Sequence, residues 1–130
     1  MKDRNIPHSF ILLIIFTVAF TFSCNKIKLD KLEDTWQVTK VSETYSTDVF
    51  ELWDFENGEL KRITKINDST QVLDTIDICQ YSLKSSTLTI KRCSIVEYNG
   101  DWQIRKLKSN IMILLNTRDN DFMYREFEKY

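Results

Sequence analysis

The chain has very little histidine, proline and glycine. It holds one His, one Pro and two Gly. The His and the Pro are His8 and Pro7, so from residue 24 onward the chain has neither, and it has no Ala there either. Without His there is no Ser–His or Cys–His nucleophile pair and no His-bearing zinc site. Two glycines are too few for a glycine-rich phosphate loop.

Cysteine spacing and net charge exclude further classes of protein. Cys79 and Cys93 are too far apart for a Cys-x-x-Cys redox or zinc motif. The 18 basic and 19 acidic residues give a net charge of −1, and the basic pairs Lys61-Arg62 and Arg105-Lys106 stand among acids. We therefore expect these pairs to be solvated strand faces and not a nucleic-acid footprint. The sequence predicts a protein that is not an enzyme, with no metal, no cofactor and no nucleic-acid partner.

The longest apolar run covers residues 10–22, near the N-terminus. As a helix it would reach about 20 Å, which is shorter than the ~30 Å hydrocarbon core of a membrane. Basic residues precede the run and Ser23-Cys24 follows it. The segment resembles a bacterial lipoprotein signal, in which that Cys is lipidated on sulfur and becomes the mature N-terminus, although Thr21 and Phe22 depart from the usual pattern. An ordinary cleaved signal and an uncleaved anchor are the alternatives.

This resemblance divides the chain into three parts. Residues 1–23 are the signal peptide, residues 24–34 are the lipidated N-terminus with a tether and a short helical turn, and residues 35–130 form a single domain. Because Asn25, not Asp, follows Cys24, the usual sorting rule implies the outer membrane. We expect a protein of the cell envelope, held to the membrane by its lipid anchor.

Both glycines follow an asparagine, in Asn57-Gly58 and Asn99-Gly100. A two-residue hairpin turn of the primed type needs positive φ at both central positions, and Asn and Gly tolerate this best. Val, Ile, Thr and aromatic residues dominate the flanking segments, which indicates an all-β domain. The pattern predicts eight strands, near residues 35–44, 49–56, 59–66, 71–83, 87–98, 101–109, 110–117 and 122–129.

Short strands joined by short turns describe an antiparallel up-and-down meander. Eight such strands can close into a barrel, which removes the exposed sheet edges. An eight-stranded barrel is either filled by its own side chains or holds one small ligand. The aromatic residues expected to line the barrel are Trp36, Phe50, Trp53, Phe55, Tyr81, Trp102 and Phe122.

Several motifs, taken in order, resemble the lipocalin-like domains of Gram-negative lipoproteins. They lie at 32–36, 53–58, 81–90, 102–107 and 112–114, so the resemblance covers about residues 32–130. It implies an eight-stranded lipocalin-like barrel closed by a stacked pair of Trp36 on the first strand and Arg125 on the last. This pair is structural. Asp34 stands where lipocalins have a Gly.

Cys79 and Cys93 leave two interpretations open. After export they meet an oxidising compartment, which favours a disulfide. Pairing Tyr81 with Ile90 would place Cys79 opposite Arg92, so one extra residue there, a β-bulge, is needed to bring both sulfurs to one face. The alternative is two buried free thiols, since free Cys packs as a small apolar residue.

The leading functional hypothesis is a membrane-anchored binding module. A barrel of this size suits a small apolar or amphipathic ligand, in a pocket bordered by Trp53, Tyr81 and Trp102. The alternative is a protein-interaction module, such as an envelope enzyme inhibitor or an accessory subunit, with a filled barrel and no small ligand. A purely structural barrel is the third hypothesis.

Overall fold

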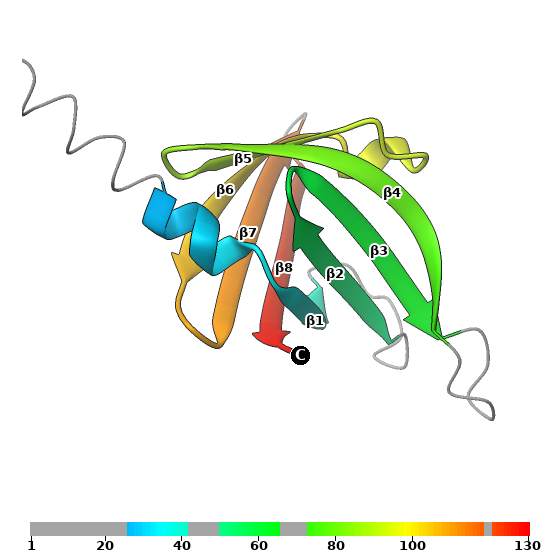
Figure 1. Ribbon diagram of the computed structural model, residues 1–130. Helices are drawn as coiled ribbons and strands as arrows, with labels where there is room; N and C mark the ends of the chain where they lie inside the picture. The colour runs from blue at the N-terminus through cyan, green and yellow to red at the C-terminus, as the bar shows by residue number, and fades with distance from the viewer. Residues whose placement is uncertain (1–25, 42–49, 66–72, 119–120) are drawn as a thin grey trace, which may run out of the picture.

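Eight antiparallel strands form a closed barrel (Figure 1). The structure is a computed structural model of the chain that describes residues 26–41, 50–65, 73–118 and 121–130. Each strand pairs with the next, and the last pairs with the first, so the predicted all-β, up-and-down, eight-stranded barrel is confirmed. The strands are β1 (Thr35–Val41), β2 (Glu51–Glu56), β3 (Glu59–Lys65), β4 (Leu73–Lys84), β5 (Thr87–Lys91), β6 (Gly100–Leu107), β7 (Ile111–Arg118) and β8 (Asp121–Lys129).

The barrel has two different ends. The closed end holds the short turns after β2, β4 and β6, and the open end is the one at which β1, β3, β5 and β7 finish. A helix over residues 26–32 leads into β1 at the closed end. Lys28 Nζ of this helix donates to the carbonyl oxygen of Ser85 in the turn after β4, at 3.2 Å. In the described part of the chain, no helix is long and apolar enough to cross a membrane.

The helix closes the barrel through its last residue. Leu32 is fully buried, and its carbonyl oxygen accepts a hydrogen bond of 3.0 Å from Trp36 Nε1. The next residue, Glu33, accepts bonds from the Tyr81 hydroxyl at 3.0 Å and from the Asn57 amide at 3.2 Å. Leu32 and Glu33 are thus hydrogen-bonded to three parts of the closed end, namely β1, the turn after β2, and β4.

The two Asn-Gly pairs behave differently. Asn57 and Gly58 have φ values of 50° and 82°, so the predicted primed hairpin turn is confirmed. The second prediction is wrong: Asn99 has φ −70°, and Gly100 is the first residue of β6. The Asn99 side chain instead closes a longer loop, by accepting from the Cys93 amide at 2.9 Å and donating to the Cys93 carbonyl at 3.2 Å.

Strand β5 is shorter than the sequence predicts. It ends at Lys91, not at residue 98, because Arg92 adopts a left-handed conformation with φ 61°. That turn ends the strand pairing with β4, and a 3-10 turn follows at Val96–Tyr98. Residues 92–99 form what we call the β5–β6 loop, and it lies at the open end.

Aromatic residues fill the closed half of the barrel around Trp53. Its ring packs on Phe127 at a centroid distance of 5.0 Å and on Trp102 at 5.9 Å. Two predicted barrel residues lie elsewhere. Phe122 is 66 % exposed, and Phe50 packs on Tyr130 outside the core cluster. The largest side chains that the core buries completely are Leu32, Trp36, Trp53, Phe55, Leu60, Leu88, Ile90, Trp102, Met112, Leu114 and Phe127.

The primed turn gives a direct test of the fold. Gly58→Val forces a β-branched side chain to φ +82°, and we expect it to lower the free energy of unfolding by more than about 1 kcal/mol. Urea unfolding measures the change. Ser82→Val is the matched control, because it adds the same side chain at an exposed position of β4. Equal stability of the two variants would contradict the assigned turn.

Candidate functional site inside the barrel

Two charged residues lie on the inward face of the barrel. Along β3 and β4, Arg62 alternates with buried Leu60, and Asp77 alternates with buried Cys79. Arg62 and Asp77 pair across the two strands and are only 2 % and 4 % exposed. The prediction of a solvated Lys61-Arg62 pair is therefore wrong for Arg62, because strand alternation turns it inward while Lys61 stays at the surface.

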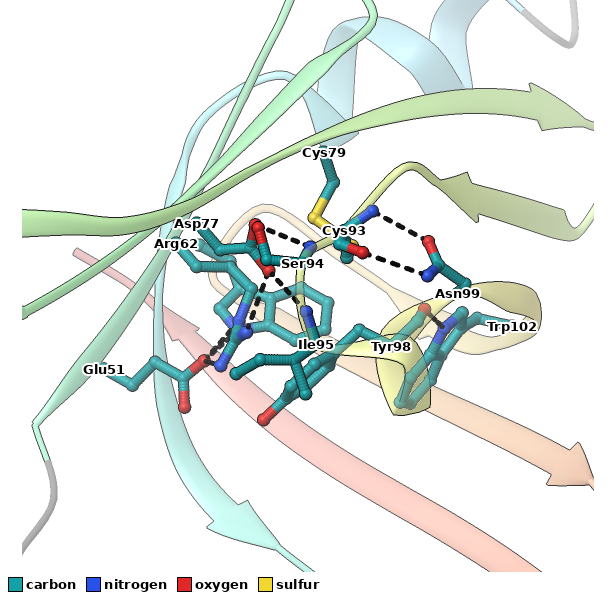
Figure 2. The surroundings of a disulfide bond; sticks show 11 residues. Glu51, Arg62, Asp77, Cys79, Cys93, Ser94, Ile95, Tyr98, Asn99 and Trp102 are labelled. Carbon is teal, nitrogen blue, oxygen red and sulfur yellow. Dashed lines mark hydrogen bonds and ion pairs between the residues drawn. A yellow bond between two sulfur atoms is a disulfide. The ribbon is translucent and has the colours of Figure 1, made fainter.

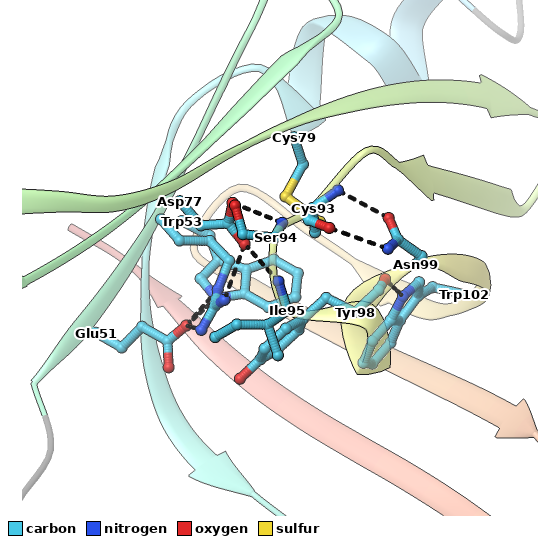
Figure 3. A network of polar contacts seen from close by, with 11 residues as sticks. Glu51, Trp53, Asp77, Cys79, Cys93, Ser94, Ile95, Tyr98, Asn99 and Trp102 are labelled. Atoms are coloured by element: carbon cyan, nitrogen blue, oxygen red, sulfur yellow. Dashed lines mark hydrogen bonds and ion pairs between the residues drawn. A yellow bond between two sulfur atoms is a disulfide. The ribbon is translucent and has the colours of Figure 1, made fainter.

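Glu51 neutralises Arg62 from β2. One carboxylate oxygen, Oε1, accepts from Arg62 Nε at 2.9 Å and lies 2.8 Å from Arg62 Nη2. The same oxygen accepts from Trp53 Nε1 at 2.8 Å. A buried cation is stable only when it is paired and hydrogen-bonded. The Glu51–Arg62 pair meets that need on one side of the guanidinium (Figure 2), and Figure 3 labels Trp53 beside it.

Asp77 connects Arg62 to the β5–β6 loop (Figure 2). Its carboxylate accepts from the backbone amides of Ser94 at 3.0 Å and Ile95 at 3.4 Å. Burial alone would raise the pKa of Asp77, but these two amides and the charge of Arg62 outweigh burial and hold the pKa below its usual value. The loop is thus hydrogen-bonded to an ionised carboxylate inside the barrel.

A disulfide fixes the same loop to β4. Cys79 and Cys93 are joined, with their Cα atoms 4.5 Å apart. The paired part of β4 and β5 contains no bulge, and the left-handed turn at Arg92 brings Cys93 to the inner face in place of the bulge that the sequence suggested. By loop-closure entropy, a crosslink between residues 14 apart is worth about 3 kcal/mol.

Tyr98 is the residue that this loop inserts into the barrel. The Arg62 guanidinium lies 3.5 Å from the centroid of its ring, and Trp53 packs against that ring at 5.7 Å. Burial and the charge of Glu51 raise the pKa of Tyr98, and together they outweigh the lowering effect of Arg62 and Arg125. The Tyr98 carbonyl accepts from Trp102 Nε1 at 3.0 Å, so the loop also contacts the aromatic core.

Two buried donors in this half of the barrel have no hydrogen-bond acceptor among the described residues. They are Arg62 Nη1 and Asn116 Nδ2. Asp77 Oδ2 lies 3.6 Å from Arg62 Nη1, which is within ion-pair range but beyond hydrogen-bond distance. An unsatisfied buried donor costs about 1–3 kcal/mol. These two atoms therefore mark where an acceptor oxygen from a ligand would be stabilised.

The three predicted pocket residues all belong to the packed core. The rings of Trp53 and Trp102 pack against each other with their centroids 5.9 Å apart. They form an apolar surface, which we call the floor, below the polar residues of the open half. The ring of Tyr81 packs on that of Phe55, with their centroids 5.2 Å apart, and Phe55 lies between Tyr81 and the Trp53–Trp102 pair. The Tyr81 hydroxyl donates a hydrogen bond to Glu33 at the closed end. Burial is the main cause that raises the pKa of Tyr81, and Glu33 raises it further. The structure brings two of the three residues to the candidate site.

The register separates the expected stacking partners, Trp36 and Arg125. Trp36 pairs with Lys129, whereas Arg125 pairs with Val41. Arg125 thus lies four positions from the partner of Trp36, roughly 13 Å along β8, and it is buried in the open half. The cation opposite Trp36 is Lys129, which forms an ion pair with Asp34. This contact lowers the pKa of Asp34.

The residues that build this polar half were not predicted from the sequence: Glu51, Arg62, Asp77, Tyr98 and Asn116. A clue was present in the alternation of strands β3 and β4, where Leu60-x-Arg62 and Asp77-x-Cys79 place a charge on the apolar face. The same alternation on β7, Met112-x-Leu114-x-Asn116, places an amide on the apolar face. No local pattern marks Tyr98, because its position depends on how the β5–β6 loop folds back.

Comparisons with known proteins bear on the fold. No family model and no curated protein matches the sequence. The structure is similar to that of japanin from Rhipicephalus appendiculatus bound to cholesterol, with a TM-score of 0.52, 14 % identity and coverage of 75 % of this chain and 74 % of japanin. The chain has a lipocalin-like fold.

Acid should weaken the attachment of the β5–β6 loop. Because the folded-state pKa of Asp77 is lowered, its contribution to stability is complete above the unfolded value of about 3.9 and is lost as pH falls through the folded value. We expect Asp77→Asn to lower stability at pH 7 and to reduce the loss of stability between pH 7 and pH 3. Urea unfolding followed by tryptophan fluorescence measures both.

Asp74→Asn is the matched control, since Asp74 is an exposed carboxylate on the same strand. If Asp77→Asn and the natural protein lose the same stability on acidification, the ionised Asp77 does not hold the loop.

Proposed function

We propose that this protein is a membrane-anchored, lipocalin-like binding protein of the bacterial cell envelope that holds a small amphipathic molecule in the open half of its barrel. The apolar part of the ligand would lie on the floor of Trp53 and Trp102. Its polar group would accept hydrogen bonds from Arg62 Nη1 and Asn116 Nδ2. The observation that carries the proposal is that these two buried donors find no acceptor among the described residues, in a barrel whose core contains Trp53 and Trp102.

The fold supports a binding role. Eight strands enclose a space suited to one small ligand, and the similar barrel of japanin is bound to cholesterol. In this chain the closed half is filled by its own side chains, so a ligand would occupy the open half, beside Tyr98 and the disulfide-tied loop.

The charges inside the barrel favour a neutral polar group on the ligand. Two buried cations, Arg62 and Arg125, are balanced by Asp77 and by Glu51. A ligand carboxylate would add an uncompensated buried charge, at a cost of several kcal/mol. A hydroxyl or carbonyl oxygen would satisfy the free donors, recovering about 1–3 kcal/mol without disturbing this balance. We therefore expect a neutral amphipathic molecule and not a fatty acid.

Asn116→Leu tests this site with two readouts. Replacing an unsatisfied buried amide by an apolar group of similar size should leave the ligand-free protein as stable or more stable. It should also weaken binding of a neutral amphiphile about fivefold to tenfold, because one donor is lost. Oleyl alcohol and oleic acid are suitable probes, and the fluorescence of Trp53 and Trp102 reports their binding.

Gln103→Leu is the matched control, because it removes an exposed amide from β6. Oleyl alcohol should bind more tightly than oleic acid, and only Asn116→Leu should weaken it. Binding that Asn116→Leu leaves unchanged, or no binding of either probe, would contradict the proposed site.

The cell-envelope part of the proposal depends on Cys24, which lies outside the described residues. What supports it is the sequence around that Cys, in which Ser23-Cys24 follows an apolar run that basic residues precede. Cells fed an alkyne fatty acid should label the natural protein, and Cys24→Ser should abolish the label. Cys79→Ser is the control for loss of a different cysteine. Labelling that persists in Cys24→Ser would contradict anchoring at this residue.

A second candidate function, a protein-interaction module, is favoured by the outer side of β4. Leu73, Ile76 and Ile78 are 42–54 % exposed there. Because β5 pairs only with the Gln80–Lys84 part of β4, no described strand covers the edge of β4 from Leu73 to Ile78. Such an edge can accept a strand from a partner. The two candidates differ in what copurifies with the protein: a small molecule or a second protein.

A further inference from the structure

A groove lies at the closed end, on the far side of the core from the candidate ligand site. It has a volume of about 330 Å³. The helix over residues 26–32 contributes Ile27, Lys28 and Lys31, the turn after β4 contributes Ser86, and β6 contributes residues 104–107. The groove therefore lies between the helix, drawn in blue and cyan in Figure 1, and the end of β6.

The groove combines positive charge with an apolar surface. Its four charged lining residues are all cations, namely Lys28, Lys31, Arg105 and Lys106, and Ile27, Ile104 and Leu107 supply the apolar part. Within the described ranges, none of these four cations forms an ion pair with a carboxylate. Four unpaired like charges around one groove repel one another, so an anion bound among them would be stabilised.

A local irregularity of β6 concentrates this charge. The β6–β7 register shifts between Ile104 and Lys106, which leaves Arg105 as an extra residue in β6. In a regular strand, neighbouring side chains point to opposite faces. A bulge re-aims them, and here both Arg105 and Lys106 line the same groove.

The groove is also close to the proposed site of lipidation. The described part of the helix starts at residue 26, and Cys24 is two residues earlier, at most about 7 Å of extended chain away. If Cys24 is anchored in the membrane, the membrane surface must lie near the helix and the groove. The open end of the barrel would then face away from the bilayer.

We propose that this groove binds the headgroup of an anionic phospholipid in the membrane that anchors the protein. The lipid phosphate lies among Lys31, Arg105 and Lys106, and the glycerol and first methylenes lie on Ile27, Ile104 and Leu107. Lys28 takes part from the turn, where its Nζ also donates to Ser86 Oγ at 3.2 Å. This inference rests on the proposed anchoring at Cys24, and it adds a second lipid contact that fixes the orientation of the barrel.

The test uses protein purified from cell membranes and placed in nanodiscs of phosphatidylcholine, with and without phosphatidylglycerol. Hydrogen exchange is followed at the backbone amides of residues 26–32 and 104–107. Phosphatidylglycerol should slow this exchange by about tenfold, and added salt should reduce the effect. Lys31→Gln with Arg105→Gln should remove most of the slowing, since two charges are worth about 25-fold in lipid affinity.

Lys40→Gln with Lys91→Gln is the matched control, because it removes two exposed cations from other parts of the barrel. It should leave the lipid effect unchanged. Equal exchange in the two kinds of nanodisc would overturn the proposal. Equal slowing by inorganic phosphate in pure phosphatidylcholine discs would also overturn it, because the groove would then be a site for free phosphate.

Failure of the anchor would be distinguishable from failure of the groove. A protein without a lipid at Cys24 would not be retained in the nanodiscs. Short-chain dihexanoyl phosphatidylglycerol would then be added to the soluble protein. Slower exchange at residues 26–32 and 104–107 would support the groove without the anchor, and unchanged exchange would overturn it.

Discussion

The buried guanidinium of Arg62 is the constraint on which the open half of this barrel depends. A cation that is only 2 % exposed must be neutralised and hydrogen-bonded, or it would cost several kcal/mol. Glu51 does this from β2, and Asp77 approaches from β4. Asp77 in turn holds the amides of the β5–β6 loop, and the Cys79–Cys93 disulfide limits how far that loop can move away. Tyr98 is placed over Arg62 by these ties.

The two halves of the barrel therefore suit different roles. The closed half is packed with aromatic and aliphatic side chains. This packing stabilises the fold, but the apolar surface there is already buried and does not serve a ligand. The open half keeps charged and amide groups inside, including two donors for which the described residues supply no acceptor. Such an interior is costly unless a ligand uses it, because each orphaned donor costs about 1–3 kcal/mol. This cost is the physical reason for assigning the ligand to the open half.

The sequence was sufficient for the fold but only for part of the site. Strand number and the Asn57-Gly58 turn follow from alternation and local turn chemistry, which operate over a few residues. The Asn99-Gly100 prediction failed because a local pattern cannot show that Arg92 ends β5 early and that Cys93 is held by Cys79. Arg62 was expected in solvent because charged residues usually are, and its partners come from three separate segments. Long-range pairing of this kind is not visible in any short stretch of sequence.

Native mass spectrometry of the protein extracted from its own membrane tests the central claim most directly. We expect a noncovalent complex heavier than the lipidated chain by the mass of one neutral small molecule. Mild activation should release that molecule and leave the chain, its disulfide and its anchor intact. Extracted protein that carries nothing beyond its covalent lipid would contradict a ligand held at Arg62 and Asn116. A second polypeptide in place of the small molecule would instead favour the protein-interaction role of β4.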